Sequence, residues 1–461
     1  MNSNRLQRML LNAIYSKIFK VALSDDIALN SYNRKGIRYG ELRVLAYLRN
    51  SHCSITDFLD WKLDVMGGEN REKIDYTIFE DLEIFRRYVI EPKQIDDLIM
   101  VHKYTCDVWK NGAKHLYFYT LHNQEHANDL IKNIVKIVKT ISYLKISAYD
   151  YYLLFISCYL HDISMVRIAS ENDFLLDEGK SEAITTELEE IWNQGNTKKS
   201  IITAYKKVDE FLEEKIRSKH AKESAEEIRK RYDLRFLENS VRESVAQISE
   251  GHMLDTRDIY FLKGDAKNKL ISYKFDKILL RFADLLDMSQ YRVSKPILNH
   301  NLDNMSDVSA FHWVSHLLTE GYELTSQYEK NPGKKNLVPD SIIEEVTLSV
   351  FVKLSQLSSK SLSKKCKYGK LDEATLKDRS FEIVMRNNDT ESCSPEQCNF
   401  LCRWFNKKNA YLVQEMQALE EYLNRVPAEE RFYKTKIRIK VVVSNPTELS
   451  DEQFEVLEKQ I

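Results

Sequence analysis

Several histidines of the sequence have a spacing that suits metal chemistry. His122 and His126 lie four residues apart, so they share one face of a helix if that helix runs through both. Apolar residues continue the stripe of His126 at helical spacing, which predicts that His126 faces a protein core. These residues are Leu130, Ile134, Ile137 and Ile141. A buried imidazole needs a partner, and the candidates are a backbone carbonyl or, where several imidazoles converge, a metal ion.

Two further segments supply carboxylates. The longest apolar stretch of the chain ends directly in His161 and Asp162, so an imidazole and a carboxylate leave one predicted helix end together. Asp284 lies in the apolar segment KILLRFADLLDM, where burial of an unpaired carboxylate would be costly. Its partner could be Arg281 one turn earlier, or a cation shared with the histidines. Imidazoles and carboxylates from distant segments could therefore converge on one ion.

Two more histidines lie between these segments. His220 continues an apolar stripe at four-residue spacing, so it faces inward on a predicted helix, and Arg217 precedes it by one turn. His252 ends another apolar stripe and is followed by a predicted loop. Arg217, His220 and His252 could hold phosphates or a second metal ion, or they could be capping and core residues.

In sequence order these residues give the pattern H…HD…D. The chain resembles the HD superfamily of metal-dependent phosphohydrolases over about residues 116–300. In that family two histidines and two aspartates from separate helices of an all-α bundle hold a divalent metal ion. The resemblance implies that the metal ligands are His126, His161, Asp162 and Asp284.

Individual segments resemble different branches of the superfamily. HNQEHANDL is similar to the HNxxHAxDV segment of cyclic-nucleotide phosphodiesterases, which implies that His122 protonates the leaving oxygen while His126 binds metal. Those enzymes continue their HD pair with Asp-His-Pro-Gly, whereas this chain reads HDISMVRIAS, a slightly better match to deoxynucleotide triphosphohydrolases. RFADLLDMSQYR is similar to the ADxxD…R segment of other HD hydrolases. The arrangement of Arg217, His220 and His252 resembles an HD subgroup linked with bacterial antiviral defence.

The chemistry of such a centre is hydrolysis of a phosphate ester. A divalent ion lowers the pKa of bound water and polarises a phosphoryl oxygen. Mixed His and Asp ligation suits Mn, Mg, Fe, Co, Ni or Zn. A histidine beside the ion can donate a proton, because its unperturbed pKa is about 6.5. His122, His220 and His252 are the predicted catalytic residues, and Arg217 and Arg281 the predicted phosphate-binding residues.

The resemblance predicts an enzyme that hydrolyses nucleotides. The leading hypothesis is a dNTP triphosphohydrolase, similar to dGTPases, that releases deoxynucleoside and triphosphate and acts in antiviral defence. One alternative is a phosphodiesterase of cyclic mono- or oligonucleotides. Another is a nucleotide sensor or scaffold that keeps the metal site without turnover. The expected partners are a nucleotide substrate, further copies of the chain in a homo-oligomer, and a nucleotide effector.

The elements that position these residues are predicted to be mainly helices. Only 12 Gly and 7 Pro occur in 461 residues, which favours long helices. Strands are predicted at 346–354, 381–385 and 436–443, with helices at 395–424 and 449–460. The predicted fold class is mainly α: an all-helical HD-domain bundle with an appended small α+β C-terminal region.

Three regions follow from this pattern. Residues 1–115 form an N-terminal helical region, with helices such as 5–22 and 77–90. Residues 116–340 form the HD phosphohydrolase core, and residues 341–461 form the α+β accessory region. The accessory region is expected to serve regulation or oligomerisation.

The predicted strand near residue 440 alternates apolar and basic residues, which gathers Lys436, Arg438 and Lys440 on one face. This face is either a solvated sheet surface or a site for an anionic regulator or a neighbouring subunit. The Ser- and Lys-rich segment 353–370, a predicted exposed loop, would add charge nearby.

The composition of the chain argues against several classes of protein. The chain has 68 Lys and Arg against 70 Asp and Glu, a net charge of −2, which argues against bulk binding of nucleic acid. No secretory signal is expected, and the longest apolar stretch is half a membrane span. Seven cysteines, an odd number, fit a reducing cytoplasm. Cys393, Cys398 and Cys402 come close to a zinc spacing, with free thiols as the alternative.

Overall fold

The structure is a computed structural model, and it describes the main part of the chain. The described residues are 77–112, 118–120, 122–141, 144, 146–167, 178–193, 197–260, 271–330, 342–353, 381–385, 400–425, 434–443 and 449–461. The chain divides into two compact units, Met1–Tyr104 and Thr105–Ile461. The first unit contains α4 (Thr77–Tyr88) and most of α5 (Pro92–Asn111). The predicted helix 5–22 lies outside the described residues.

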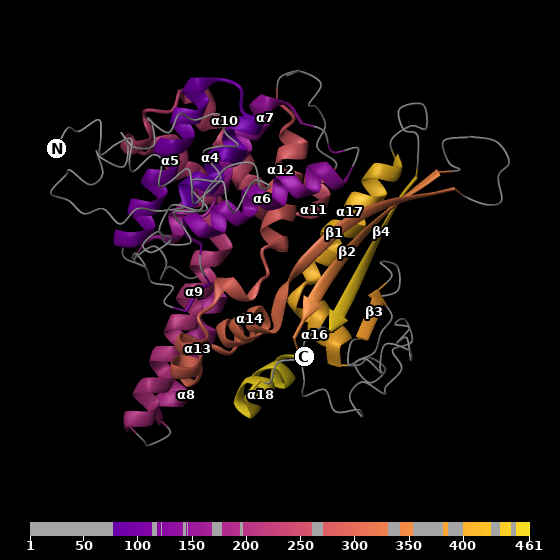
Figure 1. Ribbon diagram of the computed structural model, residues 1–461. Coiled ribbons are helices and arrows are strands. Elements are labelled where there is room, and N and C mark those ends of the chain that lie inside the picture. Colours follow the sequence, from indigo (N-terminus) through magenta and orange to yellow (C-terminus); the bar gives the residue numbers. More distant parts are fainter. Residues whose placement is uncertain are drawn as a thin grey trace, which may run out of the picture. The chain divides into compact units, whose positions relative to one another are not determined.

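The described part of the second unit is helical as far as residue 318, which confirms the mainly α fold class (Figure 1). Its elements are α6 (Gln124–Thr140), α7 (Ala148–Leu160), η1 (Ile163–Met165), α8 (Glu178–Asn193), α9 (Thr197–Lys230), η3 (Tyr232–Leu234), α10 (Asn239–Glu250), η4 (Gly251–Met253), α11 (Thr256–Tyr260), α12 (Tyr273–Leu286), η6 (Gln290–Arg292), α13 (Lys295–Asn301), η7 (Leu302–Asn304) and α14 (Asp307–Leu318).

Helix α7 forms the centre of the helical part. Ser147 and Asp150 make a reciprocal capping box that fixes the first turn of α7. From Tyr151 to Leu160 every residue is buried, as expected for a helix that is apolar all round. Helices α6, α10 and α12 pack around it. Since His161 follows Leu160 directly, the C-terminal end of α7 delivers an imidazole into the core.

Helix α6 begins at Gln124, and its start is fixed by a side-chain cap. The Asn123 side chain accepts hydrogen bonds from the backbone N–H groups of Glu125 and His126, at 3.1 and 3.4 Å. His122 therefore precedes the helix, so the condition for a shared helical face, a helix that runs through both His122 and His126, is not met. The amphipathic stripe that begins at His126 is confirmed, because the apolar residues that continue it are buried.

The sheet contains four strands: β1 (Thr319–Lys330), β2 (Ile342–Val352), β3 (Phe381–Met385) and β4 (Lys434–Val443). Their order is β1-β2-β4-β3, with β2 and β4 parallel and the other two pairs antiparallel. The predictions of β2, β3 and β4 are confirmed. Strand β1 was not predicted, because this edge strand (TEGYELTSQYEK) is polar and buries only Thr319 and Leu324 among its described side chains.

Three helices accompany the sheet: α16 (Phe400–Lys408), α17 (Ala410–Arg425) and α18 (Asp451–Gln460). Helix α17 packs on β4 and also on α11 and α12, so it lies between the sheet and the helical part (Figure 1). The sheet buries Ile437, Ile439 and Val441 of β4 toward this layer. The C-terminal α+β part is therefore joined to the helical part through a shared hydrophobic core.

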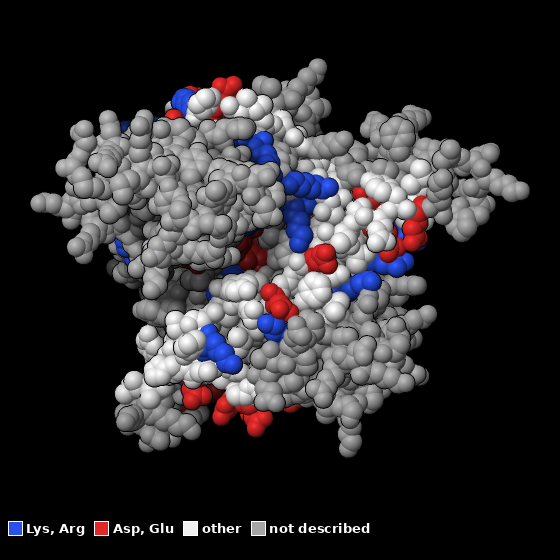
Figure 2. All heavy atoms as spheres, viewed as in Figure 1, with Lys and Arg blue, Asp and Glu red and all other residues white. Residues whose placement is uncertain are grey.

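The opposite face of β4 carries the predicted basic residues. Lys436 is exposed, and the Arg438 guanidinium lies 3.0 Å from the Glu345 carboxylate on β2. The surface view in Figure 2 shows basic and acidic side chains of the described residues interspersed on one face of the molecule. Among the described helices, none is both long and apolar enough to cross a membrane. Apart from Lys353, the predicted loop 353–370 lies outside the described residues, as do the side chains of the predicted cysteine site.

Candidate metal centre

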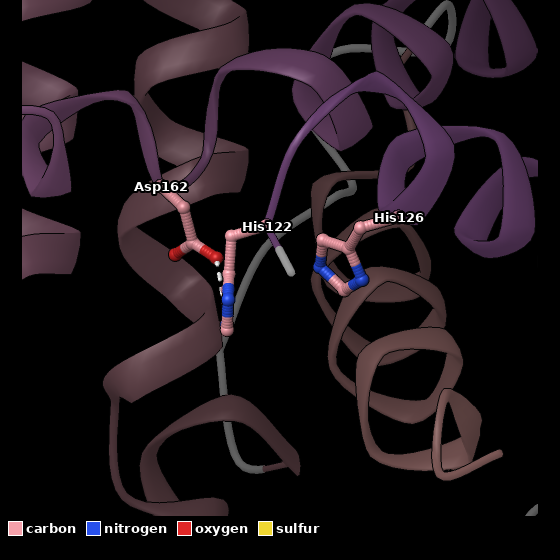
Figure 3. Close-up of side chains that lie close together, drawn as sticks. All are labelled: His122, His126 and Asp162. Atoms are coloured by element: carbon pink, nitrogen blue, oxygen red, sulfur yellow. Dashed lines mark ion pairs between the residues drawn. The ribbon is translucent and has the colours of Figure 1, made fainter. Parts of the chain in front are cut away.

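The predicted ligands come together in the second unit. His126 lies in the first turn of α6, and His161 is the C-terminal cap of α7. Asp162 follows His161, and Asp284 lies in the last turn of α12. The ligand atoms of His126, His161 and Asp284 all lie within 4.8 Å of one another. His122, His126 and Asp162 form a second such group, and Figure 3 shows these three side chains turned toward one space.

Asp162 is shared between two sets of imidazoles. Its Oδ2 atom lies 3.0 Å from His161 Nε2 and 3.7 Å from His122 Nε2. Its Oδ1 atom lies 3.3 Å from His220 Nε2 and 3.4 Å from His252 Nε2. Asp162, His220 and His252 form a third group with metal-ligand geometry. A carboxylate whose two oxygens face separate imidazole sets can bridge two cations.

The five histidines around this centre have a common orientation. Each ring places Nδ1 at hydrogen-bond distance from a protein oxygen and turns Nε2 toward the centre. The acceptors are Thr120 O for His122 (2.5 Å), Asp287 Oδ2 for His126 (2.5 Å), Cys158 O for His161 (3.1 Å), Arg217 O for His220 (2.5 Å) and Ser249 O for His252 (2.6 Å). A neutral ring that donates from Nδ1 carries its lone pair on Nε2, the atom that binds metal.

Several of these inward atoms are buried without a hydrogen bond from the described residues. They are His126 Nε2, His161 Nε2 and Asp162 Oδ1. His220 Nε2 and His252 Nε2 face each other at 2.7 Å, where two lone pairs repel unless a proton or a cation lies between them. Such a set of imidazole nitrogens and carboxylate oxygens suits a divalent transition metal better than Mg, which prefers oxygen ligands alone. The residues present therefore fit the predicted ion.

Charge coupling at the centre is strong. Burial lowers the pKa of His161, but the adjacent Asp162 carboxylate outweighs burial and raises that pKa to about 9. Burial raises the pKa of Asp162, yet His161 and the neighbouring imidazoles hold it well below its usual range. A cation that binds here displaces the proton of His161, because the ligand is the neutral imidazole.

Two residues that support His126 were not assigned from the sequence. Asp287, the C-terminal cap of α12, binds His126 Nδ1, and Arg292 Nε lies 3.3 Å from the same carboxylate. A carboxylate behind a metal-binding histidine fixes the ring and raises its basicity. Both residues lie in the ADLLDMSQYR segment that resembles other HD hydrolases. The resemblance of that segment could be seen in the sequence, but it did not indicate that Asp287 and Arg292 support His126.

His122 lies next to the proposed ligands on the segment before α6. Its ring centroid is 5.0 Å from that of His126, and Arg292 Nη2 lies 3.1 Å from its Nε2 atom. Burial and the Arg292 charge hold the pKa of His122 well below its usual range. Since a guanidinium only donates, the Nε2 atom of His122 accepts the hydrogen bond from Arg292, which requires a neutral ring at this contact.

The aromatic ring of Tyr119 contacts both Arg217 and His122. The Arg217 guanidinium is 5.4 Å from the centroid of the Tyr119 ring, which is 4.4 Å from the centroid of His122. Among the described residues no carboxylate lies within ion-pair distance of the guanidinium; burial raises the pKa of Glu213, one turn earlier on α9, and the Arg217 charge partly opposes this. This position suits the predicted phosphate contact, since the cation lies next to the centre and is not held in an ion pair.

Arg281 has a structural position instead of the predicted phosphate contact. Its guanidinium donates to the Glu415 carboxylate of α17 at 3.0 and 3.1 Å. It also donates to three carbonyl oxygens of the turn that carries His252, namely those of Gly251 (3.2 Å), His252 (2.9 Å) and Leu254 (2.7 Å). Arg281 therefore joins the turn of His252 to the C-terminal helix layer.

Removal of this buried ion pair is expected to destabilise the fold. Arg281→Met leaves the Glu415 carboxylate buried without its countercharge, so the free energy of unfolding should fall by about 3–5 kcal/mol. The matched control is Arg425→Met, which removes an exposed pair with Glu421 on α17 and should cost about 1 kcal/mol or less. Denaturant unfolding of the variants measures both values, and equal losses would contradict the role of Arg281.

The comparisons with known proteins agree with this geometry. Residues 116–338 match the family model described as HD-CE, an HD-domain-type family. No curated protein and no solved structure matches the chain. The matched segment contains all five histidines of the centre together with Asp162 and Asp284. Residues 116–338 of this chain are therefore an HD-type domain of the HD-CE family.

Proposed function

We propose that this chain is a metal-dependent phosphohydrolase of nucleotides, with deoxynucleoside triphosphates as its first substrate class. The observation that carries the proposal is the convergence of five Nε2 atoms with the Asp162 and Asp284 carboxylates on one centre. A divalent ion held there supplies an activated water and polarises a phosphoryl oxygen. The products would be a deoxynucleoside and inorganic triphosphate.

The surrounding residues account for proton transfer and phosphate binding. Hydrolysis adds the hydroxyl of water to the α-phosphorus, breaks the bond to the 5′ oxygen and puts a proton on that oxygen. His122 is neutral in the free protein, and an anionic substrate beside it would raise its pKa so that it can deliver that proton. Arg217 offers its charge to the phosphates, and Arg292 is fixed for the same purpose by Asp287.

A specific observation favours a second candidate, the phosphodiesterase of cyclic mono- or oligonucleotides. Asp162 Oδ1 faces His220 and His252, so the donor set has room for a second cation. Two cations can act on the attacking and leaving oxygens of a phosphodiester together. The HNQEHA segment resembles phosphodiesterases as well.

A substrate panel tests the proposal. The purified full chain is incubated with each candidate metal and with dNTPs, NTPs, cyclic mononucleotides and cyclic dinucleotides, and the products are separated by chromatography. We expect dNTPs to yield deoxynucleoside and triphosphate in equal amounts. Chelation of the metal should abolish turnover, and addition of metal should restore it.

The parallel control is the Asp284→Ala variant, which reports any contaminating hydrolase. Turnover of cyclic nucleotides alone would support the second candidate. Binding of nucleotide without turnover at full metal occupancy would contradict both and favour a sensor or scaffold. Assembly into a homo-oligomer, control by a nucleotide effector, a cytoplasmic location and a role in antiviral defence stay predictions.

A further inference from the structure

A half-buried lysine from the C-terminal part contacts α14, the helix that packs against the η6 turn carrying Arg292. Lys408, the last residue of α16, places Nζ 2.8 Å from His312 Nδ1 and 3.4 Å from His316 Nε2. Both histidines are on α14, one turn apart. An ammonium group only donates, so the two imidazoles accept and are neutral. One N–H of Lys408 is left without an acceptor among the described residues.

Charged residues of the metal centre influence the pKa of Lys408. Burial and the positive charges of Arg292 and Arg217 lower the pKa of Lys408 to about 7, and the carboxylates of Asp284 and Asp287 raise it. Lys408 is thus within electrostatic reach of the ligand Asp284 and of both arginines. Helix α16 lies outside the segment 116–338 that matches the family model, so the C-terminal part brings this cation to the HD domain.

Lys408 and Arg217 share an unusual feature. Neither cation has a carboxylate within ion-pair distance among the described residues, although both side chains are half-buried. Arg292, by contrast, is paired with Asp287. A half-buried cation that is not held in an ion pair has lost part of its hydration, and an anionic ligand that reaches it compensates for that loss. Two such cations beside a phosphohydrolase centre therefore suit a phosphate group.

We propose that Lys408 and Arg217 form an anion subsite that binds a phosphate of the substrate other than the one under attack. The inference rests on the proposed function and narrows it. A nucleoside polyphosphate has distal phosphates to place against these cations, whereas a cyclic mononucleotide has only the reacting phosphate. Lys408 is then a specificity-determining residue that lies outside the HD domain.

The test uses inorganic triphosphate as the probe and titration calorimetry of the full chain. Lys408→Met removes the charge and keeps an apolar stem, so Kd should rise about 10- to 100-fold, the usual loss of a charge-assisted hydrogen bond. Lys408→Arg, which keeps the charge, should stay within about 5-fold of wild type, since it retains most of that interaction. Arg217→Met should weaken binding by a similar factor to Lys408→Met.

The matched control is Lys407→Met, on the same helix end but exposed, which should leave Kd unchanged. Elemental analysis checks that metal content is equal in all variants, and thermal unfolding checks that each is folded. Wild-type affinity in Lys408→Met, or no triphosphate binding by the wild-type chain, would overturn the inference. Lys408-dependent binding by a chain that hydrolyses none of the panel would support the subsite while the proposed enzymatic function fails.

Discussion

Asp162→Ala is expected to strip the bound metal and to reduce hydrolysis below detection. Asp162 is the residue whose two oxygens face both imidazole sets, at 3.0 Å from His161 Nε2 and 3.3 Å from His220 Nε2. Its removal takes away the anionic charge that balances the cation in a buried site. Elemental analysis of the purified variant measures metal content, and the substrate panel measures turnover.

Two further variants sharpen this result. Asp284→Ala removes a ligand that contacts only the His126 side of the centre, at 3.5 Å from His126 Nε2, and should also abolish hydrolysis. If two ions bind, it should retain part of the metal that Asp162→Ala loses. Asp233→Ala, an exposed aspartate on η3, is the control and should keep metal and activity. Full metal occupancy in purified Asp162→Ala would sink the assignment of the centre.

His122→Ala is expected to keep the metal while the rate falls by about 10²–10⁴-fold, the usual contribution of general acid–base catalysis. His122 Nε2 is 3.7 Å from Asp162 Oδ2, the longest of the four imidazole distances to that carboxylate. The ring also lies before α6, not on the helix that carries His126. Single-turnover kinetics and elemental analysis separate a catalytic defect from loss of the ion.

The control for this variant is His300→Ala, because His300 is exposed on α13. It should behave as wild type in both measurements. If His122→Ala loses metal together with activity, His122 is a ligand and the group formed by His122, His126 and Asp162 is itself an ion site. The assignment of His122 to proton transfer would then be wrong.

The part of the centre that could be predicted from sequence consists of residues whose local pattern already carries the information. His161 and Asp162 end the most apolar helix, so burial of that helix places them in the core whatever the rest of the fold. His126 and Asp284 interrupt apolar stripes in the same way. His220 and His252 were assigned to the site as well, and the structure brings both to Asp162.

Other parts depend on contacts that no local pattern contains. The side chain of Asn123 caps the N-terminus of α6, so the helix begins after His122. The four-residue spacing of His122 and His126 does not reveal this cap, because it says nothing about where the helix begins. Lys408 and Glu415 contact the helical part from the segment between β3 and β4, more than a hundred residues after Asp284 and Arg281. Their sequence context is that of ordinary helix residues.

The strand order β1-β2-β4-β3 affects how the chain reaches this structure. Strand β2 pairs with β4 in parallel, for example Val346 with Ile437, so one edge of β2 stays open until a chain segment some ninety residues later has been made. Such non-local pairing is slow, and an open edge can pair with another chain meanwhile. The interval carries α16 and α17, so Lys408 and Glu415 arrive in that same late step. During synthesis the HD domain therefore emerges before Lys408 and before Glu415, the partner of Arg281, and the fold becomes complete only when the last strand closes the sheet.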